Sequence, residues 1–400
     1  MKKELVDHKI LGRKFSLFTF PRSTPGYVFW HPKGLIIYES IVGYIRELLA
    51  DLGYQEIRTP MLFNTELWKK SGHFANYKDK MYFVGKDEKW GLKPMNCPEA
   101  CLIFNEYMRS YKDLPLRFSE FSLLHRYEQA GEINGLFRTR EFMIDDAHIF
   151  CSLEQIEKEI LDLIKLTSRV YKKFGFSDYD VELSTRPEKF IGTEKQWEKS
   201  EAVLRKILRS QKIKYKENKG EGAFYGPKID FHIKDSLGRE WQLGTIQLDF
   251  ATAGRLEVNY IDESGKKQHP VIIHRAILGS IERFIAILLE HTGGILPFWL
   301  APVQVTVLPI SERHYGYAKD IRDKIYELGI RVELDERNET LEKKIRDAEV
   351  QKVPYMLVVG DKEKEKGKSK KEKWVAVRDR EGGDMGQMRL TEFVNALKYD

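Results

Sequence analysis

Cysteine is scarce in this chain: Cys97, Cys101 and Cys151 are the three among 400 residues. Small secreted domains that depend on disulfides are rich in cysteine, so the sequence excludes that class. An odd number of cysteines in a long chain indicates a reducing compartment, where thiols stay free or bind metals. We therefore expect a cytoplasmic protein.

Long apolar runs are also lacking. The longest, near Phe284–Leu289, is flanked by Arg283 and Glu290 and falls far short of the ~20 residues that a membrane-spanning helix needs. The sequence therefore predicts no membrane partner. Charge of one sign is not in large excess either, since 67 Lys and Arg against 61 Asp and Glu leave +6, which permits an anionic partner without requiring one. A hydrophobic share of 42% excludes a disordered or collagen-like chain.

Most of the chain has the pattern of a sheet with helices. The expected strands are 54–59, 117–128, 136–150, 222–234 and 239–250, and the expected helices are 34–51, 96–108, 153–174 and 194–210. Successive strands joined by short glycine-bearing turns favour an antiparallel sheet flanked by helices, an α+β domain that we place at residues 1–299. A slip in the alternation at Gly244–Thr245 predicts a β-bulge.

The last hundred residues differ in kind. Two glycines and two prolines crowd Gly293–Pro302. Beyond it we expect strands at 303–310, 330–334 and 353–360 and helices at 317–328 and 339–351. This alternation predicts a parallel sheet in a separate α/β domain over 300–400. The lysine-rich segment Lys362–Lys373 is predicted to be a solvated hairpin tip in preference to a nucleic-acid patch, although added phosphate contacts stay open.

The densest functional signal lies between residues 118 and 150. Arg126 and Glu128 flank Tyr127 on a predicted strand, so their side chains share one face of the sheet. The pair is either a cross-strand salt bridge or part of a nucleotide site, in which Arg126 holds a phosphate and Glu128 accepts from an exocyclic amine. The returning strand adds further candidates: Arg138, Arg140, Phe142, Asp145, Asp146 and His148.

Spacing gives no metal motif. Cys97, His148 and His274 are 51 and 126 residues apart. Each of them, taken singly, is expected in the core or on the surface more often than as a ligand.

Five strings carry a resemblance that changes this interpretation. They are Lys93–Pro98, Asp145–Cys151, Phe224–Lys228, Trp241–Thr245 and His274–Ser280. In order and spacing they resemble the threonyl-tRNA synthetase family, and the likeness runs from about residue 8 to the C-terminus. Pro60, the Arg126-x-Glu128 pair and Arg283 match the three general motifs of class II synthetases.

The resemblance implies a zinc ion held by Cys97, His148 and His274, with threonine at the fourth position through its amino group and hydroxyl. Three protein ligands and one open position are the composition of a working zinc site. Valine has the shape of threonine but no hydroxyl, so the metal would select threonine where a hydrophobic pocket could not. Asp146 matches the acceptor of the substrate ammonium, and Tyr225 and Gln247 match residues that line the pocket.

The resemblance also implies an ATP site with Mg²⁺ on the triphosphate. The matching residues are Arg126 and Lys228 for the α-phosphate, Arg138 and Arg283 for the γ-phosphate and adenine, and Phe142 and Glu128 for the adenine ring and its amino group. Adenylation needs no general base because the threonine carboxylate is already a nucleophile. The later transfer to tRNA does need a proton acceptor, and His73 and Gln242 match positions near the terminal ribose.

Threonine tRNA is the implied macromolecular partner. Asn338, Arg346, Glu363 and Arg378 match positions that read anticodon bases in the α/β domain of several class II synthetases, and such side chains suit the edges of unstacked bases. A homodimer formed around Pro60 is expected from the first motif.

The chain departs from the family in several places. It begins at the catalytic domain, so we expect no editing of seryl-tRNA in cis, and either a separate editing protein or a sequence that is a piece of a longer one. Glu99-Ala100 replaces a usual Gly-His, Tyr127 an asparagine and Ile144 a glutamine. The alternatives to a threonine ligase are a catalytically silent relative that binds RNA and an adenylating enzyme with another acceptor. The presence of every ligand residue and every ATP-facing arginine favours the ligase.

Overall fold

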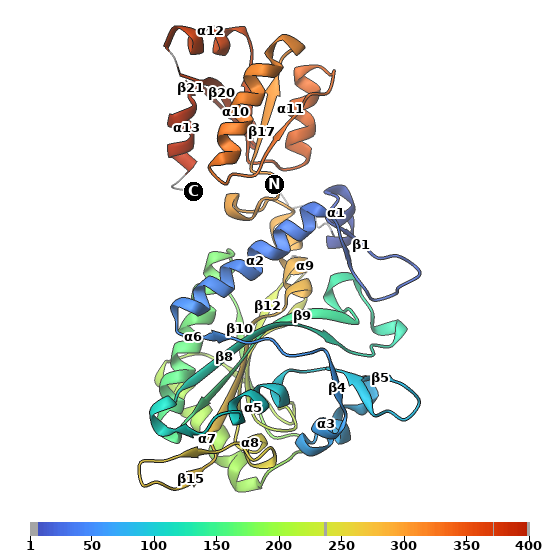
Figure 1. The fold of residues 1–400 in the computed structure, drawn as a ribbon, viewed down its shortest axis with the longest axis vertical. Helices are drawn as coiled ribbons and strands as arrows, with labels where there is room; N and C mark the ends of the chain where they lie inside the picture. Colours follow the sequence, from blue (N-terminus) through green and yellow to red (C-terminus); the bar gives the residue numbers. More distant parts are fainter. Residues whose placement is uncertain (1–6, 236–237, 371, 398–400) are drawn as a thin grey trace. The chain divides into compact units, whose positions relative to one another are not determined.

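The computed structural model describes residues 7–235, 238–370 and 372–397. The chain forms two compact units (Figure 1). The larger unit contains Phe20–Phe29 and Ile41–His291, and the smaller unit contains Met1–Thr19, Trp30–Ser40 and Thr292–Asp400. The domain boundary that we place at residue 300 stays a prediction.

The larger unit is built on an eight-stranded sheet with the order β11-β10-β12-β13-β16-β9-β8-β3. Its strands are β3 (Gln55–Glu56), β8 (Leu116–His125), β9 (Glu141–Cys151), β10 (Asp180–Ser184), β11 (Lys216–Asn218), β12 (Lys228–Lys234), β13 (Glu240–Asp249) and β16 (Val271–Ser280). All neighbours pair antiparallel except β10–β11 and β3–β8 at the two edges. The predicted antiparallel sheet is confirmed, whereas β10, β11 and β16 were not predicted.

Helices flank this sheet, as predicted. Helix α6 (Ile156–Lys173) packs on β13 and β16 and contacts α7 (Glu194–Ser210). The buried positions of α6, such as Ile160, Leu163 and Val170, recur at three and four along the chain, which places them on one face of the helix. The other helices of this unit are α2 (Pro32–Asp51, shared by both units), α3 (Glu66–Ser71), α4 (His73–Tyr77), α5 (Cys97–Asn105), α8 (Thr252–Arg255) and α9 (Ile281–Thr292).

Two small sheets and a short N-terminal pair complete the list of strands outside the smaller unit's sheet. They are β4 (Leu62–Asn64), β6 (Trp90–Leu92) and β5 (Tyr82–Val84); β15 (Lys267–Gln268), β14 (Tyr260–Ile261) and β7 (Arg109–Ser110); and β1 (Phe18–Thr19) with β2 (Phe29–Trp30).

The predicted bulge lies in β13. Asp230 pairs with Thr245 and His232 with Gln242, so two residues of β13 lie opposite one residue of β12. Gly244 belongs here because a Cβ would lie 2.8 Å from the Tyr171 hydroxyl. In a regular strand residues three apart point to opposite faces, but the bulge brings Gln242 Nε2 within 2.9 Å of Thr245 Oγ1. Both side chains also contact Asp230.

The smaller unit has a five-stranded sheet with the order β18-β17-β19-β20-β21. Its elements are α1 (His8–Lys14), β17 (Val305–Pro309), α10 (Tyr315–Glu327), β18 (Val332–Leu334), α11 (Leu341–Val350), β19 (Tyr355–Val359), α12 (Asp361–Lys370), β20 (Trp374–Asp379), β21 (Asp384–Arg389) and α13 (Leu390–Leu397). β17 pairs parallel with β18 and β19, which confirms the predicted parallel α/β part. The antiparallel pair β20–β21 was not predicted.

The lysine-rich segment is a helix. Residues 361–370 form α12, so the predicted hairpin tip was wrong, and residue 371 lies outside the described part of the chain. Glu363 and Gly367 are both buried and one helical turn apart, so they give this charged helix an inner face. No described helix is long and apolar enough to cross a membrane.

Candidate functional site

A cavity of about 560 Å³ opens on the sheet of the larger unit. Twelve of the fourteen residues predicted for catalysis, metal, ATP and threonine line it: Cys97, Arg126, Glu128, Arg138, Phe142, Asp146, His148, Tyr225, Gln242, Gln247, His274 and Arg283. Their positions in sequence span almost two hundred residues, and antiparallel pairing of β8, β9, β13 and β16 brings them together. The predicted residues outside this lining are His73 and Lys228.

Three candidate metal ligands meet at one end of the cavity. Cys97 begins α5, and His148 of β9 is paired directly with His274 of β16. The ligand atoms of the three side chains all lie within 4.8 Å of one another, and all three side chains are buried. One thiol and two imidazoles are donors that zinc prefers, so these residues fit the metal that the family resemblance implies.

The electrostatics of these ligands suit a divalent cation. Burial lowers the pKa of His148 to about 4, which keeps the imidazole neutral and able to coordinate. Burial raises the pKa of the Cys97 thiol, so a nearby cation is needed to hold the thiolate. Asp249, which was not predicted, lies with Oδ2 3.1 Å from His274 Nε2. A carboxylate behind a ligating histidine orients the ring and increases its basicity.

His73 is buried beside the metal ligands. Its Nε2 is 3.0 Å from Cys97 Sγ and its Nδ1 is 2.8 Å from Ser71 Oγ. Burial, acting with the neighbouring His274, lowers the pKa of His73 to about 3, so the ring is neutral. Its role near a ribose stays a prediction.

The side chains expected to hold threonine lie next to the metal ligands. Asp146 accepts a hydrogen bond from Asn96 Nδ2 at 3.1 Å, and Gln247 Nε2 donates to Gly226 O at 3.1 Å. The Tyr225 ring is 4.9 Å from the His274 ring. Asn96 was not predicted, although it lies inside the string Lys93–Pro98.

The other end of the cavity carries the predicted nucleotide residues. Strand β8 ends at His125, so the expected strand 117–128 is too long. Arg126 and Glu128 nevertheless line the same cavity, whereas Tyr127 does not. Among the described residues no ion pair joins Arg126 to Glu128; the Arg126 guanidinium lies 5.0 Å from the centre of the Phe142 ring.

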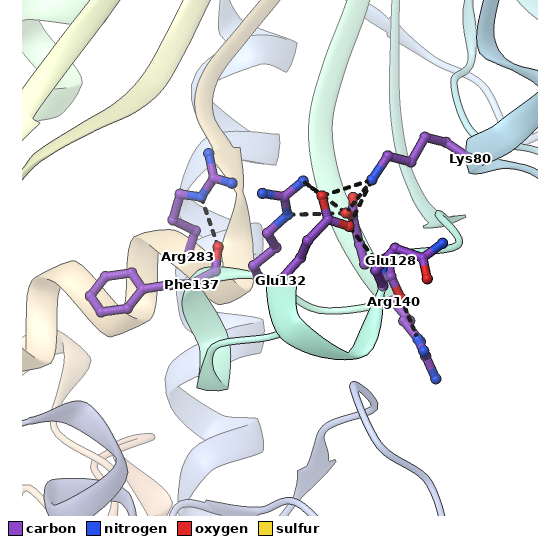
Figure 2. Close-up of polar contacts among 8 residues, drawn as sticks. Lys80, Glu128, Glu132, Phe137, Arg140 and Arg283 are labelled. Atoms are coloured by element: carbon purple, nitrogen blue, oxygen red, sulfur yellow. Dashed lines mark hydrogen bonds and ion pairs between the residues drawn. The ribbon is translucent and has the colours of Figure 1, made fainter.

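Glu128 belongs to a four-residue ion cluster, which Figure 2 shows in part. Its Oε2 is 2.9 Å from Lys80 Nζ and 2.8 Å from Arg138 Nη2. Both cations also contact Glu132, at 2.8 Å from Lys80 and 3.1 Å from Arg138. Lys80 and Glu132 were not predicted, and an isolated lysine and glutamate in turns gave no signal.

Arg283 and Lys228 are held by other groups. Arg283 donates from Nε to Phe137 O at 3.0 Å (Figure 2) and from Nη1 to Gln242 O at 3.1 Å. Phe137 stacks on Trp241 with ring centres 4.0 Å apart, which fixes the carbonyl that Arg283 contacts. Lys228 Nζ lies 2.5 Å from Asp230 Oδ2, so Asp230 would share the ammonium group with the predicted phosphate.

Two of the family departures lie at this site. Ile144 lines the cavity. Glu99 is buried two residues beyond Cys97, where desolvation raises its pKa to about 8. Its Oε1 accepts from Trp68 Nε1 at 3.3 Å, and no described residue donates a hydrogen bond to Oε2.

The four predicted anticodon residues lie in the smaller unit. Asn338 and Arg346 are exposed, and Arg378 is half-buried. Glu363 is 4% exposed, and its carboxylate accepts from the Gly360 N–H at 2.9 Å and from the Gln387 amide. Because Glu363 is buried, contact with a base requires its side chain to become accessible.

Comparison with known proteins decides the family. Residues 82–292 match the class II core domain of tRNA synthetases (G, H, P, S and T), and residues 304–399 match an anticodon-binding domain. A crystal structure of the RNA binding domain of threonyl-tRNA synthetase from Cryptosporidium parvum is 42% identical, covers 98% of both chains and has a TM-score of 0.93. The chain belongs to the threonyl-tRNA synthetase family.

Curated relatives agree. The threonine–tRNA ligases of Caldanaerobacter subterraneus and Desulforamulus reducens are 51% and 50% identical over 98% of this chain. The chain spans 60% and 61% of the length of these two threonyl-tRNA synthetases.

Proposed function

We propose that this chain activates L-threonine with ATP and transfers it to threonine tRNA. One observation carries the proposal: three candidate zinc ligands with atoms within 4.8 Å of one another lie in the cavity that Arg126, Arg138 and Arg283 also line. A metal that selects the amino acid and cations that hold a triphosphate are what the reaction requires in one place. The curated ligases at about half identity support the same activity.

In the first step the threonine carboxylate attacks the α-phosphorus of Mg²⁺-bound ATP, a new P–O bond forms and pyrophosphate leaves. Arg126 would stabilise the charge that develops on the α-phosphate, and Arg283, fixed by two carbonyls, would orient the nucleotide. Cys97, His148 and His274 would hold Zn²⁺, which when bound supplies a Lewis-acid position for the threonine amino and hydroxyl groups. Asp146 would accept from the substrate's amino group.

In the second step a ribose hydroxyl of tRNA attacks the adenylate carbonyl: an ester C–O bond forms, the bond from the carbonyl carbon to the phosphate oxygen breaks, and AMP leaves. His73 would accept the hydroxyl proton at a ring nitrogen that first leaves its present partner, Ser71 Oγ or Cys97 Sγ, with Gln242 nearby. His73→Ala should slow transfer from a preformed adenylate and leave pyrophosphate exchange within about twofold, since adenylation needs no base. Equal loss in both steps contradicts this role.

We also propose macromolecular partners for this chain: the tRNA anticodon and a second copy of the chain. Asn338, Arg346, Glu363 and Arg378 would contact the anticodon, and a second copy of the chain would dock around Pro60. Sedimentation of the purified chain tests the dimer, and a monomer at micromolar concentration contradicts it. If serine is attached to threonine tRNA and this chain does not hydrolyse the product, a separate editing protein would have to remove the serine.

Amino-acid selection gives the sharpest test. ATP–pyrophosphate exchange should proceed with threonine, fall about 10- to 200-fold with serine, which lacks one methyl, and fall by about 10⁴ with valine, which lacks the oxygen. Elemental analysis of the same sample should find one zinc per chain. Valine exchange at the serine level contradicts selection by a metal, and no exchange with threonine contradicts the activity itself. Charging of threonine tRNA with serine by the 400-residue chain should be detectable.

A further inference from the structure

Lys80 is a cation at the nucleotide end of the cavity to which neither the sequence nor the family resemblance assigned a role. It ends a 3₁₀ turn, Lys78–Lys80, that follows α4. Its Nζ lies 2.9 Å from Glu128 Oε2 and 2.8 and 3.1 Å from the two oxygens of Glu132 (Figure 2). Its backbone carbonyl accepts from the Tyr127 N–H at 2.9 Å. Lys80 is thus joined to the segment after β8 by main chain and side chain.

Arg138 competes for the same carboxylates. Its Nε and Nη2 lie 3.0 and 2.8 Å from Glu128 Oε2, and Nη2 lies 3.1 Å from Glu132 Oε1. Arg138 is also the side chain that the family resemblance matches to a contact with the γ-phosphate or adenine. Its Nε and Nη2 donors are held by the two glutamates, so a phosphate that binds through these donors requires Arg138 to leave at least part of this cluster.

The cost of that movement depends on what stays behind. Glu128 is only 6% exposed, and a buried carboxylate that loses its cation is strongly destabilised. With Lys80 in place both glutamates keep a cation after Arg138 turns away. Without Lys80, Arg138 would be the one cation among these four residues, and its departure would leave two carboxylates facing each other beside an incoming triphosphate.

Hydrogen bonding within the cluster keeps Glu132 ionised and Lys80 protonated at neutral pH, because it shifts the pKa of each group away from 7. Hydrogen bonding to Lys80 is the largest cause that lowers the pKa of Glu132, to about 2, and hydrogen bonding to Glu132 raises the pKa of Lys80. Glu132 also accepts from the Gln129 N–H at 2.8 Å, which holds the carboxylate in the turn. Lys80 therefore faces fixed carboxylates.

We propose that Lys80 is a positioning residue for ATP: it neutralises Glu128 and Glu132 so that Arg138 is released to the triphosphate. The proposal rests on the function proposed above. It distinguishes Lys80 from Arg126 and Arg283, which would touch the nucleotide themselves.

The test is Lys80→Met in threonine-dependent pyrophosphate exchange. KM for ATP should rise about tenfold, while kcat and KM for threonine stay within about twofold, because Lys80 touches neither threonine nor the reacting atoms. Lys80→Arg should keep KM for ATP near its original value. Lys78→Met is the matched control: Lys78 lies two residues away and pairs at 2.6 Å with Glu88, outside the cluster.

A second substitution separates positioning from direct contact. In the Lys80→Met background, Glu132→Gln removes one of the two carboxylates that hold Arg138, so KM for ATP should return to within about threefold of the original. If Lys80 instead contacted ATP itself, Glu132→Gln would give no rescue, and that result overturns the proposal. An unchanged KM for ATP in Lys80→Met overturns it as well.

Calorimetric titration with ATP keeps this result separate from the proposed function. If the original chain binds ATP but shows no exchange with threonine, the proposed function is contradicted. The role of Lys80 can still be tested, because Lys80→Met should weaken ATP binding tenfold and Glu132→Gln should restore it. Thermal unfolding of each variant shows whether it is folded. Tenfold weaker binding in Lys78→Met too would overturn the assignment to Lys80.

Discussion

The two ends of the cavity on the large sheet differ in how their charges are held. At the metal end, Cys97, His148 and His274 are buried, and the imidazole of His148 is neutral because burial lowers its pKa to about 4. At the other end, which Arg126, Arg138 and Arg283 line and which we call the arginine end, Arg138 is already paired with carboxylates and has 42% of its side chain exposed. The metal end is preformed, whereas Arg138 is held in exchangeable ion pairs, which phosphates would replace under the proposed function.

The largest effect should come from breaking the metal end. Cys97→Ala removes one of three protein ligands, so bound zinc should fall below about a tenth per chain and threonine-dependent exchange should drop by about 10³, since a Lewis acid supplies several kcal/mol. Elemental analysis and exchange assays measure both. ATP binding should change less than about threefold, because the arginine end does not depend on the metal.

Cys101→Ala is the matched control, since Cys101 is a buried thiol one turn further along α5 and outside the candidate ligand group. It should keep its zinc. Loss of zinc in both variants, or in neither, would show that the ligand set is wrong.

Asp249 contacts the candidate metal ligand His274 through Oδ2, 3.1 Å from His274 Nε2. Asp249→Asn removes the charge next to His274 but leaves an oxygen for the Ala251 and Thr252 N–H groups that Asp249 Oδ1 now accepts. Zinc affinity should therefore fall 10- to 100-fold, by the usual cost of losing a carboxylate behind a metal histidine. Competition with a chelator measures it. Asp262→Asn, which alters an acid that likewise accepts backbone N–H groups in a turn, should leave affinity unchanged.

The metal end also shows what sequence alone could not give. His148 and His274 are 126 residues apart, and their meeting depends on the register of β9 against β16, a strand that periodicity did not identify. Family resemblance supplied the three residues where spacing could not. Asp249 was missed because an acid at the end of a strand is ordinary in sequence, and only its distance to His274 gives it a role.

At the arginine end, local sequence rules predicted more of the structure. The period of a strand predicted that Arg126 and Glu128 share a side opposite Tyr127, and both line the cavity although β8 ends one residue earlier than Arg126. Lys80 was missed because it approaches Glu128 from a separate turn, 48 residues away in sequence. The prediction of a hairpin tip for the lysine-rich segment was wrong for another reason. The buried residues of α12 are Glu363 and Gly367, and hydrophobic periodicity does not detect a helix whose inner face is formed by a glutamate and a glycine.

Added salt should raise KM for ATP a few-fold more than KM for threonine. Added ions screen partly exposed charges much more than buried ones, so between 0.05 and 0.5 M KCl we expect KM for ATP to rise about three- to tenfold and KM for threonine less than about twofold. Initial rates of pyrophosphate exchange at fixed free Mg²⁺ measure both constants. Parallel rises in the two constants would contradict the division into a buried and a partly exposed end.

The smallest effect concerns the stability of the ion cluster at the arginine end. Glu132 has its pKa lowered from 4.5 to about 2, chiefly by Lys80, so its ion pairs stabilise the fold above about pH 4.5 and are lost as the pH falls toward 2. Glu132→Gln should therefore lower Tm at pH 7, by less than about 2 °C because solvent reaches about a third of each side chain of the pair, and the difference should vanish on acidification. Calorimetry at pH 7, 5, 4 and 3 measures it, with Glu263→Gln, an exposed acid outside the cluster, as control. A difference that persists undiminished at pH 3 would mean that Glu132 stabilises the turn through its backbone contact and not through Lys80.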